Sequence, residues 1–228
     1  MLKYGALVSA ICAGFAVQAA PLVNERTVAG PGAVQITAEI WVDNWFALYA
    51  NGLPVIEDSV PLTTEKSFNA ERVTFSADLP LTLGFEFHDF MQNETGLEYI
   101  GTDRQQMGDG GAIAQFRDAT TGKMLAVTDA NWRCTVVQAA PVSDDCAASD
   151  NPVIGQGACA SKTTALAKDW AQPGFDDRGW PAATEHSAWS VGPKGGYDQI
   201  DWDNQSALIW GPDLVHDNVV MCRLTISE

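Results

Sequence analysis

Basic residues are few in this chain. Its 228 residues include 13 lysines and arginines against 29 aspartates and glutamates, which gives a formal net charge of −16 at pH 7. A surface this acidic repels the phosphates of nucleic acids and anionic membranes. We therefore expect neither nucleic acid nor a membrane as a partner, whereas the acidity suits cation binding as well as simple solvation of the surface.

Apolar runs long enough to span a bilayer are also missing. The run from Ala6 to Val17 is shorter than the about 20 residues that a membrane-spanning helix needs, and no later run is long enough either. Lys3 precedes this run and small residues follow it at Val17-Gln18-Ala19, a pattern typical of a secretory signal peptide over residues 1–19. We expect cleavage at its end, a secreted or periplasmic location, no membrane insertion, and a single mature domain over residues 20–228.

Cysteines are scarce, and four remain once a signal peptide is set aside: Cys134, Cys146, Cys159 and Cys222. An even number in an exported chain indicates disulfides, for which four cysteines allow three connectivities. Cys134 and Cys222 lie in apolar, strand-like runs, whereas Cys146 and Cys159 lie in loop sequence. We predict one cross-strand disulfide from the first two and one loop-stapling disulfide from the second two. A zinc site is the alternative, but there is no Cys-x-x-Cys pair and the three histidines are scattered.

Catalytic signatures are absent from the sequence. It contains no Gly-x-Ser-x-Gly elbow, no His-Glu-x-x-His motif and no phosphate-binding glycine loop ahead of a helix. Gly108-Asp109-Gly110-Gly111 is rich in glycine but follows no strand, and we expect a tight surface loop there. No pair of carboxylates stands out as the acid and base of a glycoside hydrolase. Binding is therefore favoured over catalysis, with a hydrolase as the less favoured function.

Alternation of apolar and polar residues with period two is the dominant pattern. Residues 34–40 and 81–87 place their apolar side chains on one face, as half-buried strands do. The apolar run 45–50 ends at Asn51-Gly52, a strong hairpin signal because both residues tolerate positive φ.

The connections complete the prediction of fold class. Residues 141–162 are small, polar and broken by proline and glycine, which is typical of a long loop tethered by the cysteines. One short helix is expected around Lys162–Trp170. Many short strands with turn signals between them predict an all-β fold, a β-sandwich with long disulfide-tethered loops.

Two stretches of the sequence form recognisable motifs. Residues 43–52 contain an aspartate, an apolar strand and a Tyr-x-Asn-Gly hairpin, and residues 170–183 contain a Trp…Phe-Asp-Asp-x-x-Trp segment. These stretches resemble the hairpin and the Trp…Phe-Asp-Asp-Ser-x-Trp segment of the galactose-binding-like jelly-roll domains that accompany glycoside hydrolases such as rhamnosidases. Residues 209–210 and 221–226 resemble the Trp-bearing segment and the Arg-containing strand that follow. The order differs, because the Phe-Asp-Asp segment precedes the hairpin in those modules. The resemblance implies a jelly-roll sandwich and, as the leading function, carbohydrate binding.

Tryptophan and aspartate supply the candidate ligand residues. The chain has eight tryptophans, and aromatic faces are the surfaces on which sugar rings stack. We predict carbohydrate stacking and hydroxyl recognition by Trp170, Trp180, Trp189, Asp176 and Asp177. The alternative is structural: tryptophans fill sheet faces, and aspartates cap turns through their own side chains.

Metal binding is the second function that we predict. Three aspartates after Gly195-Gly196 offer hard oxygen ligands to Ca²⁺, without the glycine and terminal glutamate of an EF-hand loop: Asp198, Asp201 and Asp203. Asp43-Asn44 is a further oxygen-rich candidate. His88 and His216, each followed by aspartate, are the candidates for copper or zinc. A lone surface histidine is the alternative for each of the last two.

Overall fold

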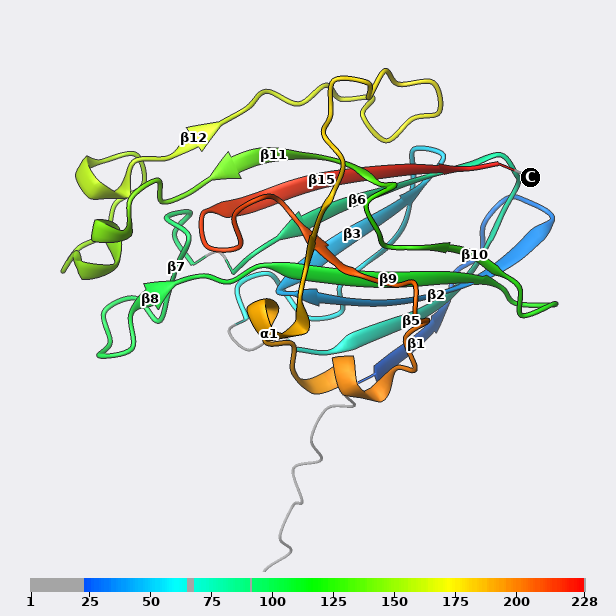
Figure 1. Cartoon of the computed structure of the whole chain (residues 1–228), viewed down its shortest axis with the longest axis horizontal. Helices are drawn as coiled ribbons and strands as arrows, with labels where there is room; N and C mark the ends of the chain where they lie inside the picture. Colours follow the sequence, from blue (N-terminus) through cyan, green and yellow to red (C-terminus); the bar gives the residue numbers. More distant parts are fainter. Residues whose placement is uncertain (1–22, 65–67, 91, 228) are drawn as a thin grey trace, which may run out of the picture.

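The computed structural model describes residues 23–64, 68–90 and 92–227, so the expected signal peptide lies outside the described residues. Two mainly antiparallel sheets, A and B, pack face to face (Figure 1). Sheet A has the spatial order β1 (Val23–Thr27), β5 (Ala70–Ala77), β2 (Val34–Asp43), β9 (Gly111–Asp118), β14 (Leu208–Trp210) and β13 (Thr184–His186), with β10 (Met124–Val127) paired to β9. Sheet B has the order β12 (Lys162–Thr163), β11 (Arg133–Ala139), β15 (Asp217–Ile226), β6 (Leu81–His88), β3 (Trp45–Ala50) and β4 (Leu53–Glu57). The predicted all-β sandwich is confirmed.

Short elements join these sheets. A small hairpin pairs β7 (Leu97–Glu98) with β8 (Gln106–Met107). The helical turns are η1 (Asp144–Ala148), η2 (Gly157–Cys159), α1 (Ala188–Val191) and η3 (Gly195–Gln199).

The core lies between the inner faces of the sheets. The period-two alternation places Ile36, Ile40, Phe85 and Phe87 there, all fully buried. The rings of Phe85 and Phe87 in sheet B stack with centroids 4.8 Å apart, and Phe87 lies 5.8 Å from Trp210 of sheet A. Full burial of each large apolar side chain contributes about 1.5–3 kcal/mol. The alternation therefore determines which face of each strand joins the core.

The β3–β4 hairpin turns at Asn51-Gly52, as predicted. Both residues have positive φ, 50° and 79°, which is the backbone of the tight turns that match the twist of antiparallel strands. The Asn51 side chain also accepts a hydrogen bond from the backbone N–H of Thr82 at 2.8 Å. The turn is thereby held against the start of β6.

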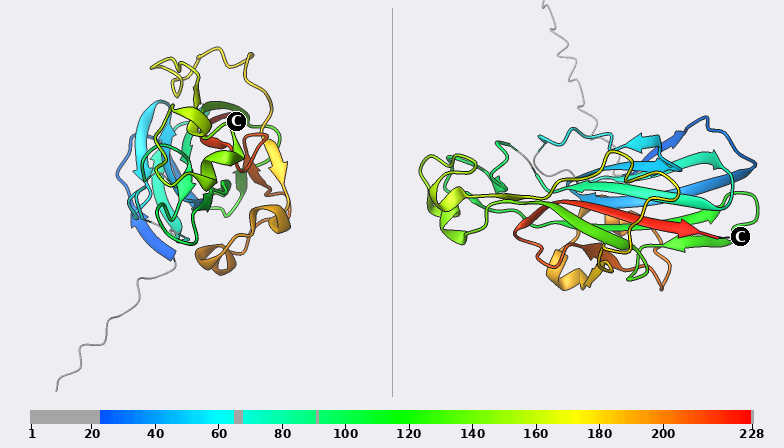
Figure 2. Two further views of the ribbon diagram at one scale, coloured as in Figure 1. Left: turned by 90° about the vertical axis from the view of Figure 1, so that its left-hand side faces the viewer. Right: turned by 90° about the horizontal axis from the view of Figure 1, so that it is seen from above.

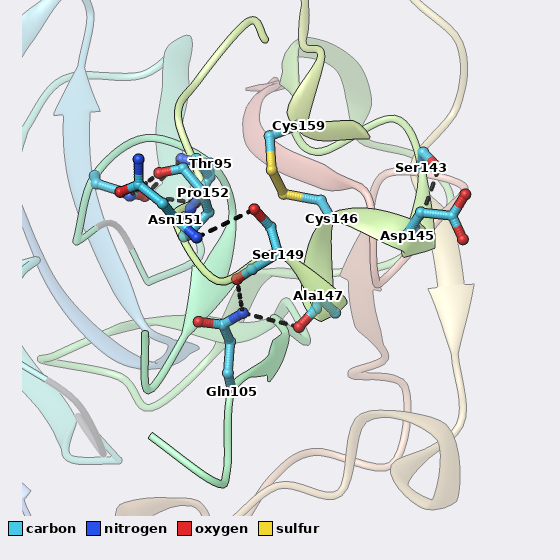
Figure 3. Close-up of a disulfide and its surroundings, with 11 residues drawn as sticks. Thr95, Gln105, Ser143, Asp145, Cys146, Ala147, Ser149, Asn151, Pro152 and Cys159 are labelled. Carbon is cyan, nitrogen blue, oxygen red and sulfur yellow. Dashed lines mark hydrogen bonds between the residues drawn. A yellow bond between two sulfur atoms is a disulfide. The ribbon is translucent and has the colours of Figure 1, made fainter. Parts of the chain in front are cut away.

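Both predicted disulfides are present. Cys134 and Cys222 are register partners on β11 and β15, and their disulfide links these neighbouring strands of sheet B. Cys146 and Cys159 join η1 to η2 within the long loop, beside the amide of Gln105, which donates to the carbonyls of Ala147 and Ser149 (Figure 3). Two disulfides are compatible with an extracellular protein.

Two extended connections cover the outer faces of the sandwich, on opposite sides of it in Figure 2. Residues 164–183, here called the sheet B strap, place Trp170 and Ala171 on Val219 and Met221. Residues 187–207, here called the sheet A strap, pack apolar side chains on sheet A, including Val191 and Ile200 against Trp41 and Ile113.

The helix expected at Lys162–Trp170 is wrong. Lys162 and Thr163 form β12 against β11, and the backbone N–H of Thr164 continues this contact by donating to Val137 O at 2.8 Å. From there the chain runs on to a turn at Trp170, whose N–H donates to Ala167 O. Pairing with an open strand edge outweighs a local helical preference that is intrinsically weak.

A buried acidic pair lies between β4 and β5. The amide of Asn69 donates to both carboxylates, to Asp58 Oδ1 at 3.2 Å and to Glu71 Oε1 at 3.1 Å. Burial raises the pKa of Asp58 to about 7; the nearby Glu71 charge acts in the same direction, and the hydrogen bonds from Val60 N–H and Asn69 oppose it. Asp58 therefore keeps a proton in the folded state at pH values where the unfolded chain has lost it.

Stability is expected to fall as pH rises from about 4 to 7, because in this window the folded state binds more protons than the unfolded state. Asp58→Asn removes the titrating group while retaining the acceptor oxygen, so the variant should gain about 2–4 kcal/mol over the parent at pH 8 and nothing at pH 4. Urea unfolding at both pH values measures this, with exposed Asp169→Asn as the matched control. Parallel pH profiles for parent and Asp58→Asn would contradict the assignment.

Candidate functional site

Three strand ends meet at one end of sheet B and bring polar side chains together. Trp45 and Val219 are both register partners of His88, so one residue farther Asp89 lies between Asn44 and Asn218. Backbone bonds hold this row: Asn44 N–H donates to His88 O at 3.0 Å, and Asp89 N–H to Asn218 O at 2.9 Å. Alternation along each strand places the three side chains on the inner face of the sheet.

Two acceptor atoms of this inner row lack a donor in the described part of the chain. Asn44 and Asn218 are 1% and 2% exposed, and neither Oδ1 atom has a hydrogen-bond partner among the described residues. Asp89, equally buried, accepts one backbone bond at Oδ1, from Phe90 N–H at 2.6 Å. An unsatisfied buried acceptor costs about 1–3 kcal/mol, and such groups in a folded protein call for a missing partner.

More carboxylates surround the row. Burial raises the pKa of Asp89 well above its usual range, and the charges of Asp43, Glu98 and Asp109 raise it further. Burial also raises the pKa of Asp43 well above its usual range, and the charges of Asp109 and Glu98 raise it further. The ammonium of Lys194 opposes this rise. Acidic groups thus outnumber basic groups around this row.

The glycine-rich loop closes the site from the side of sheet A. Gly108 and Gly110 are buried, so the expected surface loop is wrong. A Cβ on Gly108 would lie 1.8 Å from Asp89 Oδ2, and one on Gly110 would lie 2.1 Å from the Trp210 indole. Glycine is required because the backbone itself contacts the carboxylate and the indole.

Helix α1 lies at the same end of the sandwich (Figure 1). Its Val191 side chain packs on Gly111, the register partner of Asp43, where an added Cβ would lie 2.4 Å from Val191. Ser187 caps the helix by accepting from Ser190 N–H, and Gly192 ends it in the left-handed conformation. Trp189 on this helix is 93% exposed, a large apolar surface that the core does not use. Of the three predicted sugar-stacking tryptophans, Trp189 is the most exposed, Trp180 is partly buried and Trp170 is buried.

The other predicted carbohydrate residues lie together on the sheet B strap, away from α1. Trp170 is buried between Tyr49, 5.5 Å away edge to face, and Trp180, stacked at 6.3 Å. Asp176 pairs with the exposed Arg178 at 2.7 Å. These contacts within the protein account for the positions of these side chains. Ligand binding by these residues remains a prediction.

Arg223 fastens this strap to sheet B. Its buried guanidinium donates to Asp177 Oδ2 at 3.1 Å, to Gln172 O at 3.1 Å and to the carbonyl of Trp170. Its charge also lies 5.1 Å from the Phe175 ring centroid. Asp177 therefore has a structural partner in the folded chain.

The structure does not gather the predicted metal residues. Asp198 and Asp201 are exposed, and Asp203 lies 3.7 Å from Arg117. His88 contacts Glu86 at 2.8 Å, whereas His216 contacts different carboxylates. Within the described part of the chain, no three His, Cys, Asp or Glu side chains are grouped to hold a metal. A cation at any of these places would need amide or backbone oxygens as well.

The sequence does not connect Asn44, Asp89 and Asn218, although it offers Asp43-Asn44 and His88-Asp89 separately as candidates for metal binding. Their proximity depends on the register of three strands far apart in the chain. The glycines on either side of Asp109 are the other local feature of the sequence that belongs to this site.

Fold and site together define an all-β sandwich, braced by two disulfides, with a buried oxygen-rich end beside an exposed tryptophan. A stretch of 77 residues, 34% of the chain, is 31% identical to an alpha-L-rhamnosidase of Streptomyces avermitilis. The match spans 7% of that enzyme's length, and it fits a glycoside-hydrolase-related module. No family model and no solved structure matches. The described residues include no helix long and apolar enough to cross a membrane.

Proposed function

We propose that this protein is an exported carbohydrate-binding protein of the galactose-binding-like jelly-roll type, which binds its glycan with the help of Ca²⁺ at the Asn44–Asp89–Asn218 end of the sandwich. One observation carries the proposal: two buried amide oxygens without donors flank a buried carboxylate. The expected signal peptide and the two disulfides support export.

Calcium fits the donor set because it prefers carboxylate and amide oxygens in flexible arrangements. Asp43 and Asp109 would add negative charge that Lys194 alone does not balance. Acidic side chains by themselves do not form a metal group here, so Asn44 and Asn218 are essential to the proposal. Bound Ca²⁺ would compensate the charge of the buried carboxylates and hold the strand ends at the end of the sandwich where α1 packs.

The proposed ligand is a glycan that carries α-L-rhamnose. Support for this sugar comes from the similarity to an alpha-L-rhamnosidase. A deoxy sugar offers an apolar face to an aromatic ring and adjacent hydroxyls to polar groups. Trp189 is the proposed stacking surface, since its side chain is almost wholly exposed and α1 lies at this end of the sandwich.

A glycan array tests this function. We expect signals on rhamnose-terminated glycans in millimolar CaCl₂ and their loss in EDTA. Trp189→Ala should weaken binding about tenfold, equivalent to about 1.4 kcal/mol of lost stacking. Leu53→Ala, which truncates another exposed apolar side chain at the far end of the sandwich, is the control and should bind as the parent does. An array without rhamnose-dependent signals would refute the proposed ligand.

A further inference from the structure

A cavity opens at the end of the sandwich opposite to the Asn44–Asp89–Asn218 row. Its volume is about 350 Å³, within the range of small-molecule sites. The β1–β2 connection, the β3–β4 hairpin and the end of β5 line it, through residues 28–31, 50–51, 53–55 and 75–78. Strand β2 runs the length of the sandwich from near this cavity to Asp43, so the cavity is separate from the proposed glycan site.

The walls of the cavity are mainly apolar. Val28, Pro31, Val55 and Phe75 line it, and Leu53 at its mouth is 54% exposed. The connection that forms one wall is pressed against β5, because a Cβ on Gly30 would lie 2.8 Å from Ser76 O. The cavity is therefore shaped by backbone contacts and already formed without a ligand.

The polar side chains of the lining are engaged within the protein. Asn51 accepts from Thr82 N–H, and Ser76 bonds the Gln35 amide. A sugar would find few partners here for its several hydroxyls. Asp78 is different: it is exposed at the rim, and one of its two carboxylate oxygens accepts from Ala33 N–H at 2.9 Å, which leaves further acceptor capacity.

Charge selects the ligand class. The lining contains no lysine, arginine or histidine, Asp78 is its one charged side chain, and the whole chain carries a net charge of −16. Anionic ligands are repelled and a cation is attracted. We propose that this cavity binds a small arylalkylamine, with the ring among Val55 and Phe75 and the ammonium beside Asp78. This binding does not depend on the proposed glycan site.

A pair of probes with matched shape tests the proposal. Ligand-observed NMR at low salt should detect 2-phenylethylamine with a Kd of about 1 mM, and 3-phenylpropanoate should bind at least about tenfold more weakly. Asp78→Asn, which keeps the acceptor for Ala33 N–H, should remove the difference between the two probes. Val55→Trp fills the cavity and should abolish binding of both.

The control is Met124→Trp, which places the same bulk in a separate cleft beside β10 and should leave amine binding unchanged. If Val55→Trp fails to fold, the loss of charge preference in Asp78→Asn decides. No binding of the amine at about 10 mM, or equal binding of amine and acid by the parent, would overturn the proposal.

Discussion

Arg223→Met is expected to lower the free energy of unfolding by about 2–4 kcal/mol, because it removes a buried cation and leaves its acceptors without donors. Those acceptors are the Asp177 carboxylate and the carbonyls of Trp170 and Gln172. The partial exposure of Asp177 keeps the effect below that of a wholly buried pair. The sheet B strap should detach first, which urea unfolding followed by tryptophan fluorescence measures.

Arg178→Met is the matched control for this substitution. Arg178 pairs with Asp176 on the same strap, but its side chain is 89% exposed, so solvent screens the pair. Its unfolding midpoint should stay that of the parent. Equal losses for the two variants would show that Arg223 does not anchor the strap.

Two variants, Asp43→Asn and Asp89→Asn, are each expected to raise the stability of the calcium-free protein and to weaken its stabilisation by calcium. Without calcium at pH 8, each should stabilise the protein, because each removes a buried charge that its acidic neighbours repel. With calcium, the parent should gain about 2.7 kcal/mol at 100 times its Kd, a rise in Tm of about 5–10 °C. The variants should lose most of that rise in thermal unfolding.

Asp198→Asn separates this site from the one that the sequence favoured for calcium. Asp198 is exposed on η3, outside the row of Asn44, Asp89 and Asn218. The rise in Tm that calcium causes in Asp198→Asn should equal the rise in the parent. A response lost in Asp198→Asn but kept in Asp89→Asn would move the calcium site to residues 198–203.

Features of the fold that depend on local pattern could be predicted from the sequence. Residues 34–40 alternate strictly, and Asn51-Gly52 is a turn by its own conformational preferences, so each identifies its element alone. The pairing of Cys134 with Cys222 followed from their strand-like surroundings. The helix predicted over residues 162–170 is wrong because the strand that pairs with Lys162 and Thr163, β11, is distant in sequence.

The candidate site could be predicted only in fragments. The sequence indicates Trp189 as an aromatic ligand residue, but its exposure depends on where α1 packs, which is set by the contact of Val191 with Gly111. The row of Asn44, Asp89 and Asn218 exists because three strands end in register. Such register is a property of the assembled sheet, and no spacing in the sequence reveals it.

Isothermal titration of methyl α-L-rhamnoside into the protein tests the central claim most directly. We predict one binding site per chain in calcium, no measurable heat after EDTA treatment, and recovery when calcium is restored. Asn44→Ala should abolish the heat in calcium, whereas Leu53→Ala should leave it intact. Binding of equal strength with and without calcium, or undiminished binding by Asn44→Ala, would contradict a calcium-dependent glycan site at this end of the sandwich.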